Sequence, residues 1–109
     1  MVQAANLGFP RIGLQRELKK ALESYWKGEM PEAALEDAAR DLRRRHWQLQ
    51  QDAGIDVIPS NDFSLYDQML DMCALVGCVP ARYGWQGGTV GKDVYFAMAR
   101  GSKVAPAMD

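Results

Sequence analysis

Short apolar segments alternate with amphipathic stretches along this chain, and this order is the strongest constraint on its fold. Residues 4–9 are mostly apolar and are closed by Pro10 and Gly13, which predicts a buried strand followed by a turn. A second short run, residues 55–59, is β-branched and follows a helix stop at Gly54, which predicts another strand. The order strand, helices, strand, helix favours an α/β fold with a parallel sheet and right-handed crossovers.

Amphipathic patterning predicts the helices. Apolar residues recur every three or four positions over residues 14–27, and Gly28 is expected to end this first helix. The same pattern over residues 31–53 predicts a second helix, which is the longest and clearest element. A third helix is expected to begin at an N-cap among Ser60, Asn61 and Asp62 and to run to Gly77.

A glycine-rich segment, residues 84–91, reads as a mobile surface loop before a short predicted helix over residues 92–100. Its Gly-Lys pair invites comparison with a phosphate-binding P-loop, but Gln86 stands where that motif needs a glycine and Asp93 where it needs a hydroxyl. An acidic residue there repels phosphate, so the sequence argues against a P-loop. Residues 101–109 show no periodic element.

Composition and charge exclude several classes of protein. The chain is 48% hydrophobic and 25% charged, as in a globular domain, and its net charge of -1 exerts no general pull on nucleic acid or anionic membrane. Cys73 and Cys78 are interpreted as free thiols in a reducing compartment, and their spacing matches no common zinc motif. Residues 1–6 lack the basic region and the long apolar run of a signal peptide, and no stretch approaches the roughly 18 apolar residues that a membrane span needs. We expect a cytoplasmic protein without a membrane or nucleic-acid partner.

No catalytic constellation is predicted in this chain. His46 is the only histidine and lies on the apolar side of the second helix, which is more typical of a packed residue than of a ligand. Asp62 and Asp67 lie near a predicted strand end, yet helix capping explains Asp62 equally well. We therefore assign no catalytic residue and no metal ligand.

Positive charge at the start of the first helix offers a candidate anion site. Arg16, Lys19 and Lys20 are spaced to project from one side of the opening turns, beside backbone N–H groups that lack helical partners. Cations at a helix N-terminus suit a carboxylate or a phosphate. The alternative is an ordinary exposed helix face.

A second basic cluster, residues 43–45 beside His46 and Trp47, suggests contact with nucleic acid. Consecutive helical residues point about 100° apart, so these residues do not form one stripe. Nearby acidic residues also dilute the positive field, and a solvated helix face is the favoured interpretation.

Several motifs together resemble the cobalamin-independent methionine synthase family. The chain opens with Leu-Gly-Phe-Pro-Arg-Ile-Gly at residues 7–13, followed by Arg-Glu-Leu-Lys at residues 16–19. Further segments resemble that family in order and spacing: residues 23–26, 58–63, 66–68, 79–84 and 93–101. The resemblance covers essentially residues 6–109 and is highly specific.

The resemblance implies an enzyme of two (β/α)8 barrels that transfers the N5 methyl group of 5-methyltetrahydropteroyltriglutamate to homocysteine and forms methionine. It implies zinc, bound by the carboxy-terminal barrel, as the group that holds homocysteine as a thiolate. It also implies a direct transfer without cobalamin and a monomeric full-length enzyme.

In this family the Arg-Glu-Leu-Lys segment helps to hold the triglutamate tail, and the resemblance places that role on Arg16, Glu17, Leu18 and Lys19. A complete barrel needs about 250 residues, so residues 1–109 are expected to form a partial amino-terminal barrel domain that is inactive alone. The alternative is a non-catalytic α/β module that binds an anion or a partner protein.

Overall fold

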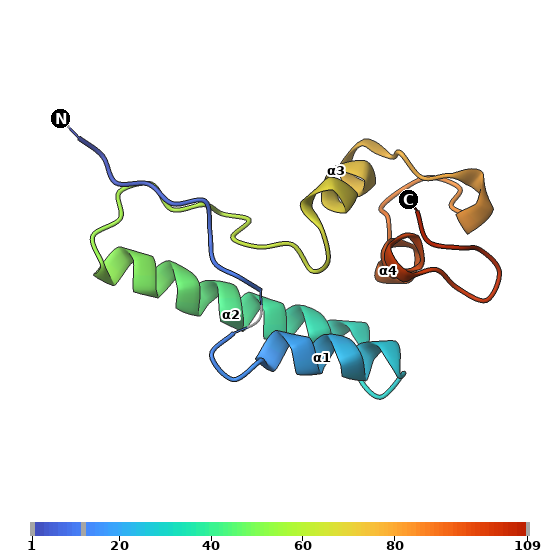
Figure 1. The fold of residues 1–109 in the computed structure, drawn as a ribbon, viewed down its shortest axis with the longest axis horizontal. Coiled ribbons are helices and arrows are strands. Elements are labelled where there is room, and N and C mark those ends of the chain that lie inside the picture. The colour runs from blue at the N-terminus through green and yellow to red at the C-terminus, as the bar shows by residue number, and fades with distance from the viewer. Residues whose placement is uncertain (1, 12, 109) are drawn as a thin grey trace. The chain divides into compact units, whose positions relative to one another are not determined.

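The computed structural model describes residues 2–11 and 13–108. Its elements, in order, are α1 (Glu17–Trp26), α2 (Glu32–Asp52), α3 (Gln68–Val76), the 3-10 helix η1 (Ala81–Tyr83) and α4 (Lys92–Arg100) (Figure 1). The chain divides into two compact units, Met1–Leu65 and Tyr66–Asp109. No helix among the described residues is long and apolar enough to cross a membrane.

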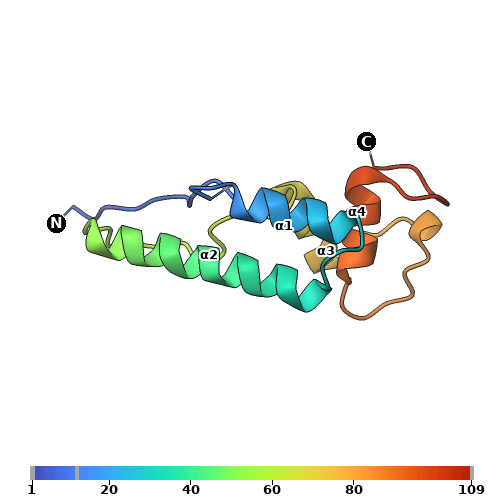
Figure 2. The same ribbon diagram turned by 90° about the horizontal axis from the view of Figure 1, so that it is seen from below.

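The first unit is built on the pair of helices α1 and α2, which lie side by side in both views (Figures 1 and 2). Both helices follow the predicted patterning, and their inward residues are almost completely buried: Leu18, Ala21 and Leu22 of α1, with Leu35, Ala39 and Leu42 of α2. Burial of these apolar faces supplies the main stabilisation of the unit. The predicted second helix, residues 31–53, is thus confirmed almost to the residue.

The two predicted strands are extended segments that lie alongside each other (Figure 1) and meet at a single parallel bridge, Ala5 to Val57. The backbone N–H groups of Asp56 and Val57 both donate to the carbonyl oxygen of Ala4, at 2.9 and 3.0 Å. Residues 4–7 are exposed, so the prediction of a buried strand is wrong for this chain. Strands of a parallel sheet are buried by neighbouring strands and by helices on both faces, and the described residues supply only part of that cover.

Two predicted helix starts are also wrong. α1 begins at Glu17 rather than at Leu14, whose side chain is 83% exposed, because Arg16 adopts a left-handed conformation (φ 59°). α3 begins at Gln68, where Asp67 is the N-cap and its carboxylate accepts the N–H of Leu70 at 3.4 Å. The expected cap, Asp62, has a left-handed φ of 62° and is bonded elsewhere. At the start of α3, tertiary contacts of Asp62 therefore override its local capping preference.

The second unit packs α3 against α4. Leu70 of α3 and Tyr95, Phe96 and Met98 of α4 are buried. α4 spans the predicted residues 92–100, and residues 101–108 form no helix or strand, as predicted. The Tyr95 hydroxyl donates to Asp71 Oδ1 at 2.6 Å and accepts the backbone N–H of Tyr66 at 3.1 Å.

Alkaline pH should destabilise the second unit through Tyr95. Burial chiefly, and the Asp71 carboxylate in addition, raise the pKa of the Tyr95 hydroxyl well above its ordinary value of 10.0. The folded state therefore favours the protonated phenol, and this stabilisation is complete below pH of about 10 and declines as the pH rises further. Urea denaturation at a series of pH values measures the decline.

A Tyr95→Phe variant is the control for that measurement, because it lacks the titrating group. The difference in unfolding free energy between the wild-type chain and Tyr95→Phe should shrink as the pH rises above about 10. A difference that is constant over that range would show that Tyr95 does not couple folding to pH.

Candidate functional site

The start of α1 carries the predicted anion-binding segment. Arg16 is the N-cap, and its carbonyl oxygen accepts the N–H of Lys20 at 3.0 Å. The preceding turn is closed by the N–H of Arg16, which donates to the Gly13 carbonyl oxygen at 3.4 Å. The first backbone N–H groups of a helix have no helical acceptor, so this end of α1 bears partial positive charge. The side chains of Arg16, Lys19 and Lys20 are exposed there.

Glu17 holds this helix start in place. Its carboxylate accepts the backbone N–H of Gln15 at 3.2 Å and an N–H of the Arg45 guanidinium at 3.3 Å. The pKa of the Glu17 carboxyl is lowered. The main cause is a hydrogen bond from its own backbone N–H, and the bonds from Gln15 and Arg45 act in the same direction. A side chain at Gly13 would clash with this carboxylate, because a Cβ atom there would lie 2.0 Å from Glu17 Oε2. Glu17 thus ties the turn before α1 to α2.

The other two segment residues differ in access. Leu18 is 1% exposed and belongs to the core between α1 and α2, so its side chain is not available to a ligand. The Lys19 side chain is 51% exposed and lies 3.9 Å from Glu23 in a surface ion pair. Such a pair contributes at most about 1 kcal/mol, so a stronger anion can compete for Lys19. Arg16 and Lys19 are the charged groups that this segment offers to a ligand.

A pocket of about 260 Å³ adjoins Lys19, and the sequence did not reveal it. Its lining residues are Arg11, Lys19, Leu22, Glu23 and Trp26. Arg11 also donates a hydrogen bond from its guanidinium to the Leu65 carbonyl oxygen. The pocket therefore combines two cations and one carboxylate with an aliphatic and an aromatic wall. Helical spacing alone could have linked Lys19 to Leu22, Glu23 and Trp26, but Arg11 reaches the site through tertiary folding.

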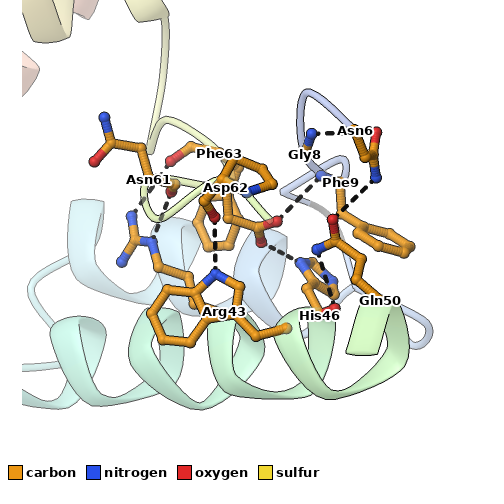
Figure 3. Close-up of polar contacts among 11 residues, drawn as sticks. Asn6, Gly8, Phe9, Arg43, His46, Gln50, Asn61, Asp62 and Phe63 are labelled. Carbon is orange, nitrogen blue, oxygen red and sulfur yellow. Dashed lines mark hydrogen bonds and ion pairs between the residues drawn. The ribbon is translucent and has the colours of Figure 1, made fainter. Parts of the chain in front are cut away.

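A buried polar cluster surrounds Asp62, one of the two carboxylates noted in the sequence near the end of the second predicted strand (Figure 3). The Asp62 carboxylate is hydrogen-bonded to His46 Nδ1 and accepts the backbone N–H of Phe9 at 3.2 Å. The Phe9 ring stacks on the His46 ring with 4.5 Å between centroids. Gly8 is required beside them, because a Cβ atom at this position would lie 2.0 Å from the Asp62 carbonyl oxygen.

Two amides extend this cluster. Gln50 donates to the His46 carbonyl oxygen at 3.1 Å, and Asn6 donates to the Gln50 side-chain oxygen at 3.2 Å (Figure 3). The cluster joins the amino-terminal segment, α2 and the segment after residue 59. His46 is thus a packed residue, as predicted, and Asp62 is its buried partner rather than a helix cap.

The basic residues of α2 do not form one surface. Arg43 donates to the carbonyl oxygens of Asn61 at 3.1 Å and Phe63 at 3.3 Å, and its guanidinium lies 4.4 Å from the centre of the Phe63 ring. Arg45 is paired with Glu17, whereas Arg44 is exposed. Two of the three arginines are therefore engaged within the first unit, which argues against the nucleic-acid interpretation.

The described residues contain no candidate metal site. Among residues 2–11 and 13–108, no three His, Cys, Asp or Glu side chains are close enough together to hold a metal ion. Cys73 and Cys78 are free thiols in the second unit. The family resemblance assigns the zinc ligands to the carboxy-terminal barrel, and the described residues offer no alternative group of ligands.

Comparison with known proteins identifies close relatives. Residues 3–109 match the family model described as "Cobalamin-independent synthase, N-terminal domain". Over all 109 residues the chain is 57% identical to a 5-methyltetrahydropteroyltriglutamate-homocysteine methyltransferase of Acidithiobacillus ferrooxidans, and covers 14% of that protein. It is 59% identical over 93% of its length to a protein of the same name from Salinibacter ruber, and 62% identical over 89% of its length to one from Syntrophotalea carbinolica. It covers 13% of each of these two proteins.

Proposed function

The chain belongs to the cobalamin-independent synthase family, within its N-terminal domain, and on that premise we propose that it binds the polyglutamate tail of a methyl-folate. The chain spans only 13–14% of the length of the curated relatives it matches. The activity proposed for the whole protein is transfer of the N5 methyl group of 5-methyltetrahydropteroyltriglutamate to homocysteine. The names of these relatives contain both substrates.

The observation that carries the proposal is the exposed pair of cations, Arg16 and Lys19, at the N-terminal end of α1. A triglutamate tail bears several carboxylates, which suit both cationic side chains and the partial positive charge of a helix start. The adjoining pocket adds Arg11 as a third cation and a wall of Leu22 and Trp26 for the methylene groups of the tail.

The four segment residues then have different roles. The Arg16 guanidinium can hold one carboxylate through two parallel hydrogen bonds, and Lys19 supplies a movable point charge. Glu17 positions the helix start through Gln15 and Arg45. Leu18 contributes through packing and through its backbone N–H.

The wider fold is proposed to be a (β/α)8 barrel of which this chain supplies the first strands and helices. The parallel bridge between Ala5 and Val57 supports this proposal, because the first two strands of such a barrel are parallel neighbours. The location of the cations after the first extended segment also agrees with a barrel, whose ligand sites lie at the carboxyl ends of its strands. Zinc and homocysteine are assigned to parts of the full-length protein beyond this chain.

A chimera tests the tail-binding role, in which this chain replaces the matching segment of the Acidithiobacillus ferrooxidans methyltransferase. Calorimetry would compare methyl-tetrahydrofolate with three glutamates and with one. Arg16→Ala and Lys19→Ala should each lower the affinity for the triglutamate form about tenfold or more, because each removes a hydrogen-bonded charge pair worth about 1.5–3 kcal/mol. The monoglutamate form should bind almost unchanged.

Arg44→Ala and Lys27→Ala are matched controls, since both side chains are exposed and lie outside the segment. These variants should leave the affinity for both forms unchanged. If Arg16→Ala and Lys19→Ala bind the triglutamate form as tightly as the unsubstituted chimera does, the start of α1 is only a solvated helix face.

A further inference from the structure

The end of α3 places the chain's two cysteines at special positions. Gly77, which follows the last residue of α3, adopts a left-handed φ of 75°. The N–H groups of Gly77 and Cys78 both donate to the carbonyl oxygen of Cys73, the latter at 2.8 Å. The bond from Cys78 back to Cys73 is the six-residue closure of a Schellman motif.

This motif brings two particular side chains together. The residue just beyond the left-handed glycine and the residue five positions earlier commonly make a side-chain contact across the end of the helix. Here those residues are Cys78 and Cys73, the only cysteines in the chain. Both are free, with Cys78 exposed and Cys73 partly exposed, so an oxidant in solution can reach them.

We propose that Cys73 and Cys78 form a redox-active dithiol that hydrogen peroxide converts reversibly to an intramolecular disulfide. The exposed Cys78 thiolate attacks one peroxide oxygen, the O–O bond breaks, and a sulfenic acid forms with release of water after proton transfer. The Cys73 thiolate then attacks the sulfenic sulfur and expels a second water. Two thiols are oxidised to one disulfide, and one peroxide is reduced to two water molecules.

The geometry favours a disulfide that opens easily. The bridge would close a loop with only four residues between the cysteines, so it removes little entropy from the unfolded chain. Exposed bridges of this kind are readily reduced, in contrast to buried structural disulfides. The dithiol belongs to the second unit, Tyr66–Asp109, whereas the residues of the tail site belong to the first unit.

The first test measures how strongly the fold brings the thiols together. The 109-residue chain is equilibrated with reduced and oxidised glutathione, in native buffer and in concentrated urea, and trypsin then releases residues 46–82, which contain both cysteines. Mass spectrometry of this peptide gives the fraction that has lost two hydrogens. The effective concentration of the thiol pair should be at least about tenfold higher in the native buffer than in urea. Equal or lower values in native buffer would overturn the proposal.

The second test uses peroxide and single-cysteine variants. The wild-type chain should give the intramolecular disulfide, which dithiothreitol reverses, whereas Cys73→Ser should stop at a sulfenic acid trapped by dimedone. If the wild-type chain instead gives disulfide-linked dimers or an irreversible sulfinic acid, the two thiols do not act as a pair.

A third comparison links the effect to the helix end. In Gly77→Ala the new Cβ atom would lie 3.2 Å from a ring carbon of Trp85, and the alanine would have to adopt a positive φ. Both effects should loosen the motif and lower the effective concentration of the thiol pair. Gly54→Ala is the matched control, because Gly54 also has positive φ (83°) and follows α2, and a Cβ atom there meets nothing within 4 Å. If Gly77→Ala behaves like Gly54→Ala and like the wild-type chain, the Schellman motif does not pair the thiols.

Discussion

Replacing Asp62 by alanine should lower the unfolding free energy of the first unit by at least about 2 kcal/mol, because two buried partners lose a hydrogen bond and each unsatisfied group costs about 1–3 kcal/mol. The Asp62 side chain is 0% exposed and that of His46 is 5% exposed, so water cannot replace the lost partner. The variant also removes the acceptor for the Phe9 N–H and leaves two polar groups unsatisfied. Denaturation monitored by helical circular dichroism measures the loss.

Asp62→Asn separates the charge from the hydrogen bonds. Asparagine tolerates the left-handed φ of 62° at this position and can still accept the Phe9 N–H. It should therefore be less destabilising than alanine. A loss of less than about 1 kcal/mol for Asp62→Ala would mean that the cluster in Figure 3 does not hold the amino-terminal segment against α2.

Leu35→Ala should cost about 2–5 kcal/mol of unfolding free energy, as is usual for truncation of a fully buried leucine. Leu35 is 0% exposed at the interface of α2 with α1, and its truncation leaves a cavity that the two helices can fill only in part. Urea denaturation gives the value for the variant and the wild-type chain.

Leu49→Ala is the matched control for Leu35→Ala, because it makes the same change in the same helix at a side chain that is 47% exposed. Its effect should be much smaller, because little apolar surface returns to water. If the two variants lose the same free energy, packing of α1 on α2 is not the main source of stability in this unit.

The helices were the most predictable part of the fold. α2 and α4 occupy nearly the predicted residues because their apolar stripes have helical spacing and because Gly54 and Gly101 follow them. Both signals are local, so one sequence is sufficient to read them.

The wrong predictions share a physical cause. Asp62 has the chemistry of an N-cap, yet its carboxylate binds His46 and the Phe9 N–H, which are distant in sequence, and α3 starts at Asp67 instead. The apolar segment at residues 4–9 has the composition of a buried strand, but burial requires neighbours that composition does not specify.

The candidate site was only partly readable from the sequence. The cations Arg16 and Lys19 and the absence of a P-loop pattern are properties of the sequence itself. The structure adds the pairing of Glu17 with Arg45 and the pocket that Arg11 shares with Lys19. These pairings join residues from separate segments, and no spacing rule connects them.

By itself, the sequence determined the positions of the main helices, the charge at the start of α1 and membership of the family. The tertiary structure decided which polar residues are buried together, where α1 and α3 begin, and which residues of the segment 16–19 are accessible. The physical reason is the range of the interactions. Helical periodicity depends on neighbours within about four positions, whereas a buried hydrogen-bonded pair such as His46 with Asp62 forms only after the chain has brought α2 and the following segment together.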